Sequence, residues 1–274
     1  MKSGKLFKNG LWGIAIAIVA LIAVFPFVWM VLVSLKTRVL TYDPSIWFFK
    51  PTLENYLAVF QQRHLLFFAR NSVIVVLGTM VLSLIIGSMA AYGFARFSFS
   101  RKEDLAFWIL SLRMLPPMAT VIPFFILARF TNLLDTHIIL ILAYMTFNIP
   151  FSVWMMRGFF EEIPRQIEES ALVDGCSHWQ ILTKILLPLS LPGLTATAIF
   201  CIINSWNEFA FALFLTGINA RTLPTTVTFF LSVTGVIWGE MAAVGVLTAL
   251  PVLIFAMLVQ RYMIRGLTFG AVKQ

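Results

Sequence analysis

Residues 168–188 read EESALVDGCSHWQILTKILLP and form a polar, patterned stretch between two long apolar runs, 137–160 and 187–215. Each flanking run has at least the roughly 20 residues that a helix needs to cross about 30 Å of hydrocarbon. A polar stretch between two such runs must emerge from the bilayer into water. The sequence therefore predicts a membrane protein with a structured loop at its surface.

The overall composition supports this class. Of 274 residues, 60% are hydrophobic and only 12% are charged, and the mean hydropathy is +0.91. Soluble domains carry about 25% charged residues. In a soluble protein the net charge of +8 would suggest nucleic acid. Here basic residues at membrane ends set the topology and meet anionic lipid, so we expect membrane lipid and no nucleic acid as the partner of this charge.

Working outward from the polar stretch, the apolar runs predict an all-α, polytopic fold with six transmembrane helices. With no linker or repeat in the chain, we expect a single domain over 1–274, with its core at 69–265 and a loop at 161–188. Prolines inside the runs, at 116–117, 150 and 192, favour kinks. The six runs are 11–35, 71–97, 105–130, 137–160, 187–215 and 241–264.

Basic residues predict the orientation. Six spans put both termini on one side, and twelve Lys and Arg fall on that side, within 2–8, 96–102, 157–184 and 261–273. Seven fall on the other side. Because cytoplasmic loops carry the excess of Lys and Arg, we expect both termini in the cytoplasm. The loop follows an even number of spans, so it is predicted on the same side.

Local signals within the loop predict two short helices. Pro164 suits the first turn of a helix, where its missing N–H costs nothing. Gly175 is placed where a helix ends in the left-handed conformation. Ser177 and Gln180 have the spacing of a capping box for a second helix. The Leu-Pro pair at 187–188 predicts the return into the bilayer.

The surface of the first of these helices is predicted to be mostly acidic. Ile163, Ile167 and Ala171 recur at four-residue spacing and would form a narrow apolar stripe. Over 157–184 the chain has five acidic and three basic residues, which favours a basic groove of another protein over the anionic membrane surface. From the residues alone, an ordinary solvated loop is an equal alternative. The carboxylates expected on the exposed surface are Glu168, Glu169 and Asp174.

Motif spacing resembles a known family. Glu169-Ser170-Ala171, three residues, Gly175, nine residues and Ile185-Leu186-Leu187-Pro188 resemble the EAA loop of permease subunits of bacterial ABC importers. The only departure is Ser170, which replaces the middle alanine. Two further stretches, SWNEFAFAL at 205–213 and RGLTFGAVK at 265–273, resemble the carbohydrate-importer branch, in particular its second, maltose-permease-like subunit.

The resemblance implies a division of labour in a bacterial inner membrane. The loop would be a coupling helix that docks on an ATPase dimer, and the subunits of that dimer would bind ATP and Mg²⁺. This chain lacks the phosphate-binding motif GxxxxGK[ST], so no cofactor is expected in it. Further partners would be a second homologous permease and a periplasmic or lipid-anchored solute-binding protein. The implied docking positions are Glu168, Glu169, Ser170, Ala171, Asp174, Gly175, Leu187 and Pro188.

Polar side chains within the spans suggest a translocation path. Asn, Glu and Tyr beside an aromatic face such as Trp206 suit sugar hydroxyls. Structural or interfacial roles compete with this interpretation. Glu208 lies about 30 Å beyond the inner end of its span at helical rise, and Arg113 can snorkel inward. The candidate path residues are Tyr144, Asn148, Asn204, Asn207 and Glu208.

The residues leave the solute open. A sugar fits best, and a polyol, a sulfonated sugar or a glycerophosphodiester are alternatives for the same machinery. An ion-coupled carrier would need a carboxylate near the bilayer midplane, and Glu208 is the only candidate. An intramembrane enzyme lacks a nucleophile–base set. Cys176, Cys201 and three scattered histidines show no metal-ligand spacing.

Overall fold

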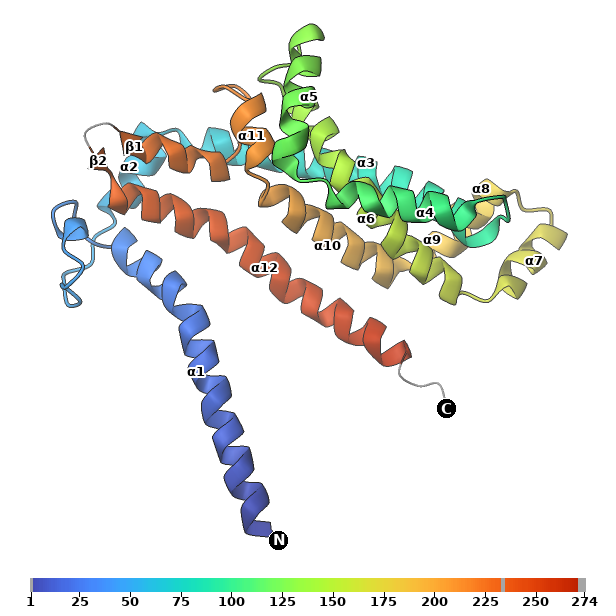
Figure 1. Ribbon diagram of the computed structural model, residues 1–274, viewed down its shortest axis with the longest axis horizontal. Helices are drawn as coiled ribbons and strands as arrows, with labels where there is room; N and C mark the ends of the chain where they lie inside the picture. The colour runs from blue at the N-terminus through green and yellow to red at the C-terminus, as the bar shows by residue number, and fades with distance from the viewer. Residues whose placement is uncertain (1, 233–234, 271–274) are drawn as a thin grey trace. The chain divides into compact units, whose positions relative to one another are not determined.

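Helices make up most of the chain (Figure 1), which confirms the predicted all-α class. The computed structural model describes residues 2–232 and 235–270, with side chains over 12–231 and 235–259. The elements in chain order are α1 (Lys2–Ser34), η1 (Leu40–Tyr42), α2 (Glu54–Gln62), α3 (Leu65–Arg96), α4 (Lys102–Ser111), η2 (Leu112–Met114), α5 (Pro117–Phe130), α6 (His137–Glu162), α7 (Arg165–Val173), α8 (His178–Ile181), η3 (Leu182–Leu186), α9 (Leu187–Leu189), α10 (Leu191–Trp206), α11 (Ala210–Leu215), η4 (Pro224–Phe230), β1 (Leu231–Ser232), β2 (Gly235–Val236) and α12 (Trp238–Gly270).

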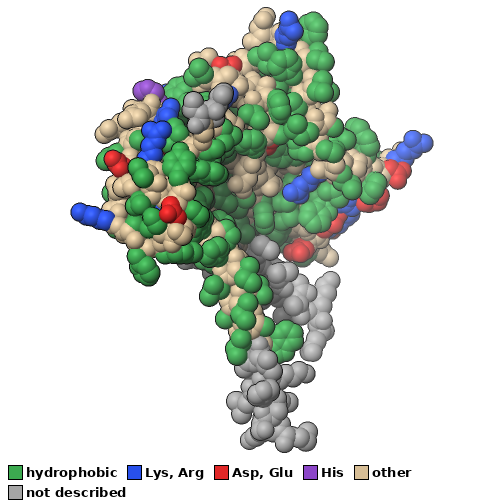
Figure 2. Space-filling view, turned by 60° about the vertical axis from the view of Figure 1, so that its left-hand side comes forward, with side chains coloured by type: hydrophobic (Ala, Val, Ile, Leu, Met, Phe, Trp, Pro, Cys, Tyr) green, Lys and Arg blue, Asp and Glu red, His purple; other side chains and the backbone are tan. Residues whose placement is uncertain are grey.

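Within the described residues, four helices are long and apolar enough to cross a membrane. They are α1, α3, α6 and the part of α12 that ends at Val259. Two further candidates are bent pairs of helices. Counting each pair as one span gives the six predicted. Hydrophobic side chains cover much of the face shown in Figure 2.

The predicted span 105–130 is not one continuous helix. Its two halves, Lys102–Met114 and Pro117–Phe130, meet at 91°. Pro116 is extended, with φ −62° and ψ 130°, and Pro117 begins α5. Neither proline has an N–H to donate, so helical hydrogen bonds cannot run across the pair. The expected kink is therefore a break, whereas α6 continues through Pro150.

The predicted span 187–215 is also divided. The segment His178–Leu189 meets α10 at 82°, and α10 ends at Trp206, before α11 begins at Ala210. Pro192 lies in the first turn of α10, where a missing N–H costs nothing. It therefore starts a helix rather than kinking one, and the sharp bend falls at Ser190.

The chain packs as two compact units, 1–65 with 226–250 and 66–225 with 251–274. The single domain over 1–274 stays a prediction. In the first unit, buried Asn55 of α2 donates to the carbonyls of Ser34 and Lys36 at 2.9 and 2.7 Å. A Cβ at Gly239 would lie 2.4 Å from Asn55 Oδ1, so the start of α12 approaches α2 closely only because residue 239 is glycine.

Close helix packing in the second unit also depends on small residues. A Cβ at Gly87 of α3 would lie 2.4 Å from Cβ of Ser152 on α6. A Cβ at Gly193 of α10 would lie 2.3 Å from the ring of Phe159 on α6. Glycine at these points lets the backbones approach, as is common between membrane helices. Helix α6 is thus packed between α3 and α10.

Asp135, between α5 and α6, ties this turn to the loop that follows α11. Burial raises the pKa of its carboxyl, but hydrogen bonds from four backbone N–H groups together outweigh this effect, and the pKa lies below its ordinary value. The side chain of Asn219 adds a fifth donor at 2.9 Å. The backbone donors, at 2.9–3.2 Å, belong to Gly217, Ile218, Asn219 and Ala220.

Asp135→Asn is expected to lower the stability of the detergent-purified chain by about 1–2 kcal/mol, because charge-assisted bonds are replaced by weaker ones. A carboxyl whose pKa is lower in the folded than in the unfolded state stabilises the folded state at pH values above the unfolded pKa. This stabilisation is lost as the pH falls through the folded pKa. The difference in Tm from wild type should therefore persist from pH 8 to about pH 4 and shrink below it. Asp104→Asn, an exposed carboxylate of α4, is the control. Equal Tm values for the Asp135 variant and wild type at pH 7 would contradict the role of this carboxylate.

Candidate functional site

The loop between α6 and α10 is ordered by the two caps that its sequence predicts. Gly175 has φ +86°, and the N–H groups of Gly175 and Cys176 donate to the carbonyls of Leu172 and Ala171 at 3.0 and 2.9 Å. This pair of bonds is a Schellman motif, which ends α7. Both predictions for this turn are confirmed, because Ser177 and Gln180 form a complete capping box at the start of α8.

A buried ion pair fastens α7 to the end of α3. Arg96 Nε donates to a Glu168 carboxylate oxygen, and both side chains are only 8% exposed. Arg96 Nη2 also donates to the carbonyls of Phe160 and Ile163, at 2.7 and 3.0 Å. One guanidinium thus joins the end of α3, the end of α6 and the first turn of α7. The sequence alone indicates only a topological role for Arg96, because no local pattern connects it to Glu168.

This ion pair corrects the predicted faces of α7. Glu168 was expected on the exposed surface, but it is buried. Ile167 was expected in the buried stripe, but it is 41% exposed. Helical spacing allows either face to turn inward, and the cation of Arg96 at the end of α3 attracts the face that carries Glu168. Ala171 is on the buried face, as expected.

An apolar cluster lies under the loop. Ala171 of α7 and three residues of α8 and η3 pack against the ends of α3 and α6. Leu187 is half-buried against the same cluster, whereas Pro188 is exposed. The cluster consists of Ala91, Tyr92, Ala95, Met156, Phe160, Ala171, Ile181, Leu182 and Leu186.

The opposite face of α7 is free in the isolated chain and combines apolar and acidic groups. Val173 is 88% exposed and Leu172 is 43% exposed. Glu169, Ser170 and Asp174 are exposed around them. We call these five residues, 169, 170 and 172–174, the α7 outer face. An exposed apolar centre with a charged rim is the usual composition of a protein-binding surface.

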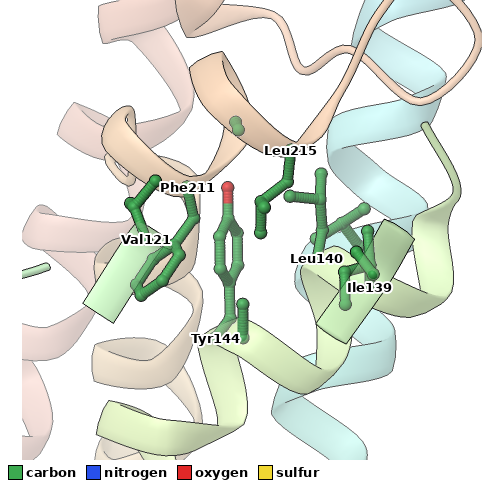
Figure 3. Packing of buried hydrophobic residues seen from close by; sticks show 10 residues of the cluster. Val121, Ile139, Leu140, Tyr144, Phe211 and Leu215 are labelled. Carbon is green, nitrogen blue, oxygen red and sulfur yellow. The ribbon is translucent and has the colours of Figure 1, made fainter. Parts of the chain in front are cut away.

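The candidate path residues do not line one exposed surface, although the Tyr144 hydroxyl and the Glu208 carboxylate lie close enough to interact. Tyr144 and Asn148 of α6 are fully buried, and Asn148 donates to Ser205 Oγ of α10 at 2.9 Å. Figure 3 shows the Tyr144 ring within an apolar cluster, beside Phe211 and Leu215. In this conformation both side chains therefore lie in the packing of α6 against its neighbours, and their role in a path stays a prediction.

The other three candidates lie at the junction of α10 and α11. Glu208 accepts the N–H groups of Phe211 and Ala212 at 3.0 and 3.2 Å, and thereby caps the first turn of α11. Asn204 is half-buried and Asn207 is exposed. The contacts of Glu208 support the structural alternative for this residue. Within the part of the chain that the structure describes, no group of three His, Cys, Asp or Glu residues could hold a metal ion.

Taken together, the spans and the capped loop with its exposed face define a polytopic membrane protein with a structured loop between two spans. The chain belongs to the family described as "Binding-protein-dependent transport system inner membrane component", which matches residues 83–269. The resemblance to permease subunits of ABC importers is thereby confirmed.

Several curated proteins match over nearly the whole chain. One is a probable ABC transporter permease, y4oR, of Sinorhizobium fredii, 38% identical over 99% of this chain and 98% of the relative. A second is the trehalose/maltose transport system permease MalG of Thermococcus litoralis, 34% identical over 98% of both chains. A third is the sulfoquinovosyl glycerol permease SmoH of Agrobacterium fabrum, 34% identical over 95% of this chain and 92% of the relative.

A solved structure shares the fold. A chain of a bacterial ABC transporter involved in the import of the acidic polysaccharide alginate aligns with a TM-score of 0.79. The alignment covers 96% of this chain and 98% of the other, at 23% identity. At that identity the likeness supports the fold, and the permease class rests on the family and the closer relatives.

Proposed function

We propose that this chain is the permease subunit of an ATP-driven importer that moves a saccharide across a bacterial inner membrane by alternating access. The observation that carries the proposal is the α7 outer face, presented by a helix that is capped at its end and fastened to α3 by a buried ion pair. A rigid attachment of this kind can transmit a push to the spans. Relatives named for trehalose/maltose and sulfoquinovosyl glycerol transport support a saccharide.

In this proposal the docking residues divide into two groups. Glu169, Ser170 and Asp174 contact the ATPase subunit, together with Leu172 and Val173. The second group fixes the position of α7 on the spans without contacting the ATPase, and consists of Glu168, Ala171, Gly175 and Leu187. Pro188 lies outside the contact with the ATPase. The ATPase dimer supplies ATP and Mg²⁺, and the remaining partners are a second homologous permease and a periplasmic or lipid-anchored solute-binding protein. No nucleic acid takes part.

The proposed orientation places both termini and α7 in the cytoplasm. It is supported by the excess of Lys and Arg on that side. Six of these Lys and Arg residues, within 2–8 and 261–273, are not among those whose side chains the structure describes. Alternative solutes for the same machinery are a polyol, a sulfonated sugar or a glycerophosphodiester. An ion-coupled carrier is a remote alternative, which uptake without the ATPase would favour.

The test uses the complete transporter, purified with its ATPase and second permease and reconstituted with its binding protein. Val173→Asp should lower ATP-dependent uptake at least tenfold, because it places a charge at the apolar centre of the α7 outer face. Glu169→Lys should weaken copurification of the ATPase. Val39→Asp is the matched control, since Val39 is 81% exposed but lies in the segment predicted outside. Equal uptake by the Val173 and Val39 variants would refute the docking assignment.

A further inference from the structure

A cavity of about 310 Å³ lies between the α4–α5 break, α6 and α11. Its size is at the lower end of the range for small-molecule sites, about 300–1,000 Å³. The residues that line it combine one cation, two hydroxyls and three aromatic rings. The lining side chains used below are Arg113, Thr120, Phe124, Thr146, Phe147 and Phe211.

Arg113 places a cation at this cavity without an ion-pair partner among the described side chains. It lies in η2, just before the break at Pro116, and its Cζ is 4.6 Å from the centre of the Phe151 ring. A cation over a ring face keeps its N–H groups free for hydrogen bonds. No ion pair among the described side chains includes Arg113. An arginine in a membrane span normally faces water or a partner charge.

Snorkelling does not readily account for Arg113. It follows the start of α4 at Lys102 by eleven residues, or about 16 Å at helical rise. In the proposed orientation this depth is near the middle of about 30 Å of hydrocarbon. With α4 taken along the membrane normal, Arg113 is then far from both interfaces, and an aqueous cavity is the natural surrounding of its guanidinium.

The remaining lining fits a saccharide. Thr120 and Thr146 each donate their hydroxyl hydrogen to a carbonyl of their own helix, so their lone pairs remain free to accept sugar O–H groups. Phe124 and Phe211 meet edge to face, with ring centres 5.5 Å apart, and Phe147 lies on the facing helix α6. Rings of this kind pack against the apolar faces of pyranose rings.

We propose that this cavity binds an anionic saccharide, with Arg113 receiving its carboxylate or sulfonate group. The inference rests on the proposed function and names the substrate class of that transporter. Carboxylates and sulfonates present the pair of oxygens that the guanidinium fork matches. A neutral sugar would leave this cation without a counter-charge in the membrane.

The test measures the ligand-dependent Tm of the assembled transporter in detergent, without its binding protein. One pair of probes is digalacturonate and its neutral dimethyl ester. The other pair is 6-deoxy-6-sulfoglucose and neutral glucose. The acids should raise the Tm at lower concentration than the neutral sugars. Arg113→Gln should weaken the apparent affinity for the acids about tenfold to a hundredfold and leave the neutral sugars unaffected. Arg113→Lys should retain part of it, and Arg129→Gln, which removes another exposed arginine, should match wild type.

Three results would overturn the inference. The first is that neither acid raises the Tm of the wild-type transporter. The second is that acids and neutral sugars raise the Tm at equal concentrations. The third is that the Arg113→Gln transporter loses its second permease on purification. The last would show that Arg113 pairs with that subunit. None of these results bears on the proposed function, which is tested separately by the ATP-dependent uptake of the Val173→Asp and Val39→Asp transporters.

Discussion

Arg96→Met is expected to abolish ATP-driven uptake while the chain still inserts into the membrane. The substitution leaves the Glu168 carboxylate buried without its counter-charge and removes the donor to the carbonyls of Phe160 and Ile163. Breaking one side of a buried pair costs about 3–5 kcal/mol. That is comparable to the stability of a local element, so α7 should detach from α3 and no longer transmit movement of the ATPase.

Hydrogen exchange over 163–181 measures this detachment directly, beside uptake. Lys184→Met is the matched control, since it removes a positive charge from the same loop at an exposed position. The double variant Arg96→Met with Glu168→Leu should recover protection of the loop, because an apolar pair of similar volume often replaces a buried ion pair without loss. Unchanged exchange and uptake in Arg96→Met would show that the ion pair does not hold α7.

Gly175→Val is expected to uncouple ATP hydrolysis from transport, with uptake reduced tenfold or more. A Cβ at this position meets nothing within 4 Å, so the penalty comes from the backbone, whose φ is +86°. A β-branched residue strongly disfavours that conformation, at a cost of about 1–3 kcal/mol. Relaxing φ would break both hydrogen bonds that end α7 and would turn the α7 outer face away from its contact.

Two variants separate this backbone effect from bulk. Gly175→Asn should keep coupling near wild type, because asparagine tolerates the left-handed conformation. Gly158→Val makes the same substitution at a glycine of α6 that also has open space around it but ordinary helical backbone. The readouts are ATPase stimulation and uptake in proteoliposomes. If Gly175→Val and Gly158→Val behave alike, the left-handed turn is not required for coupling.

Local chemistry explains which parts of the loop the sequence predicts correctly. The left-handed Gly175 and the Ser177–Gln180 box depend on residues within a few positions of each other, so their spacing is sufficient. The number of apolar runs likewise follows from the length needed to cross hydrocarbon. The same local signals cannot tell whether a proline lies within a continuing helix, as Pro150 does, or starts a new one, as Pro117 and Pro192 do.

By itself the sequence determined the helical membrane class, the apolar runs, the caps of the loop and, through the EAA spacing, the family. The tertiary structure alone decided which face of α7 is buried, because Arg96 is more than seventy residues from Glu168 along the chain and no periodicity connects them. It also decided that Tyr144 is packed within a core and that Arg113 faces a cavity. Both depend on which helices meet in space, and the free energy of a polar side chain in a membrane is set by the neighbours that it finds there.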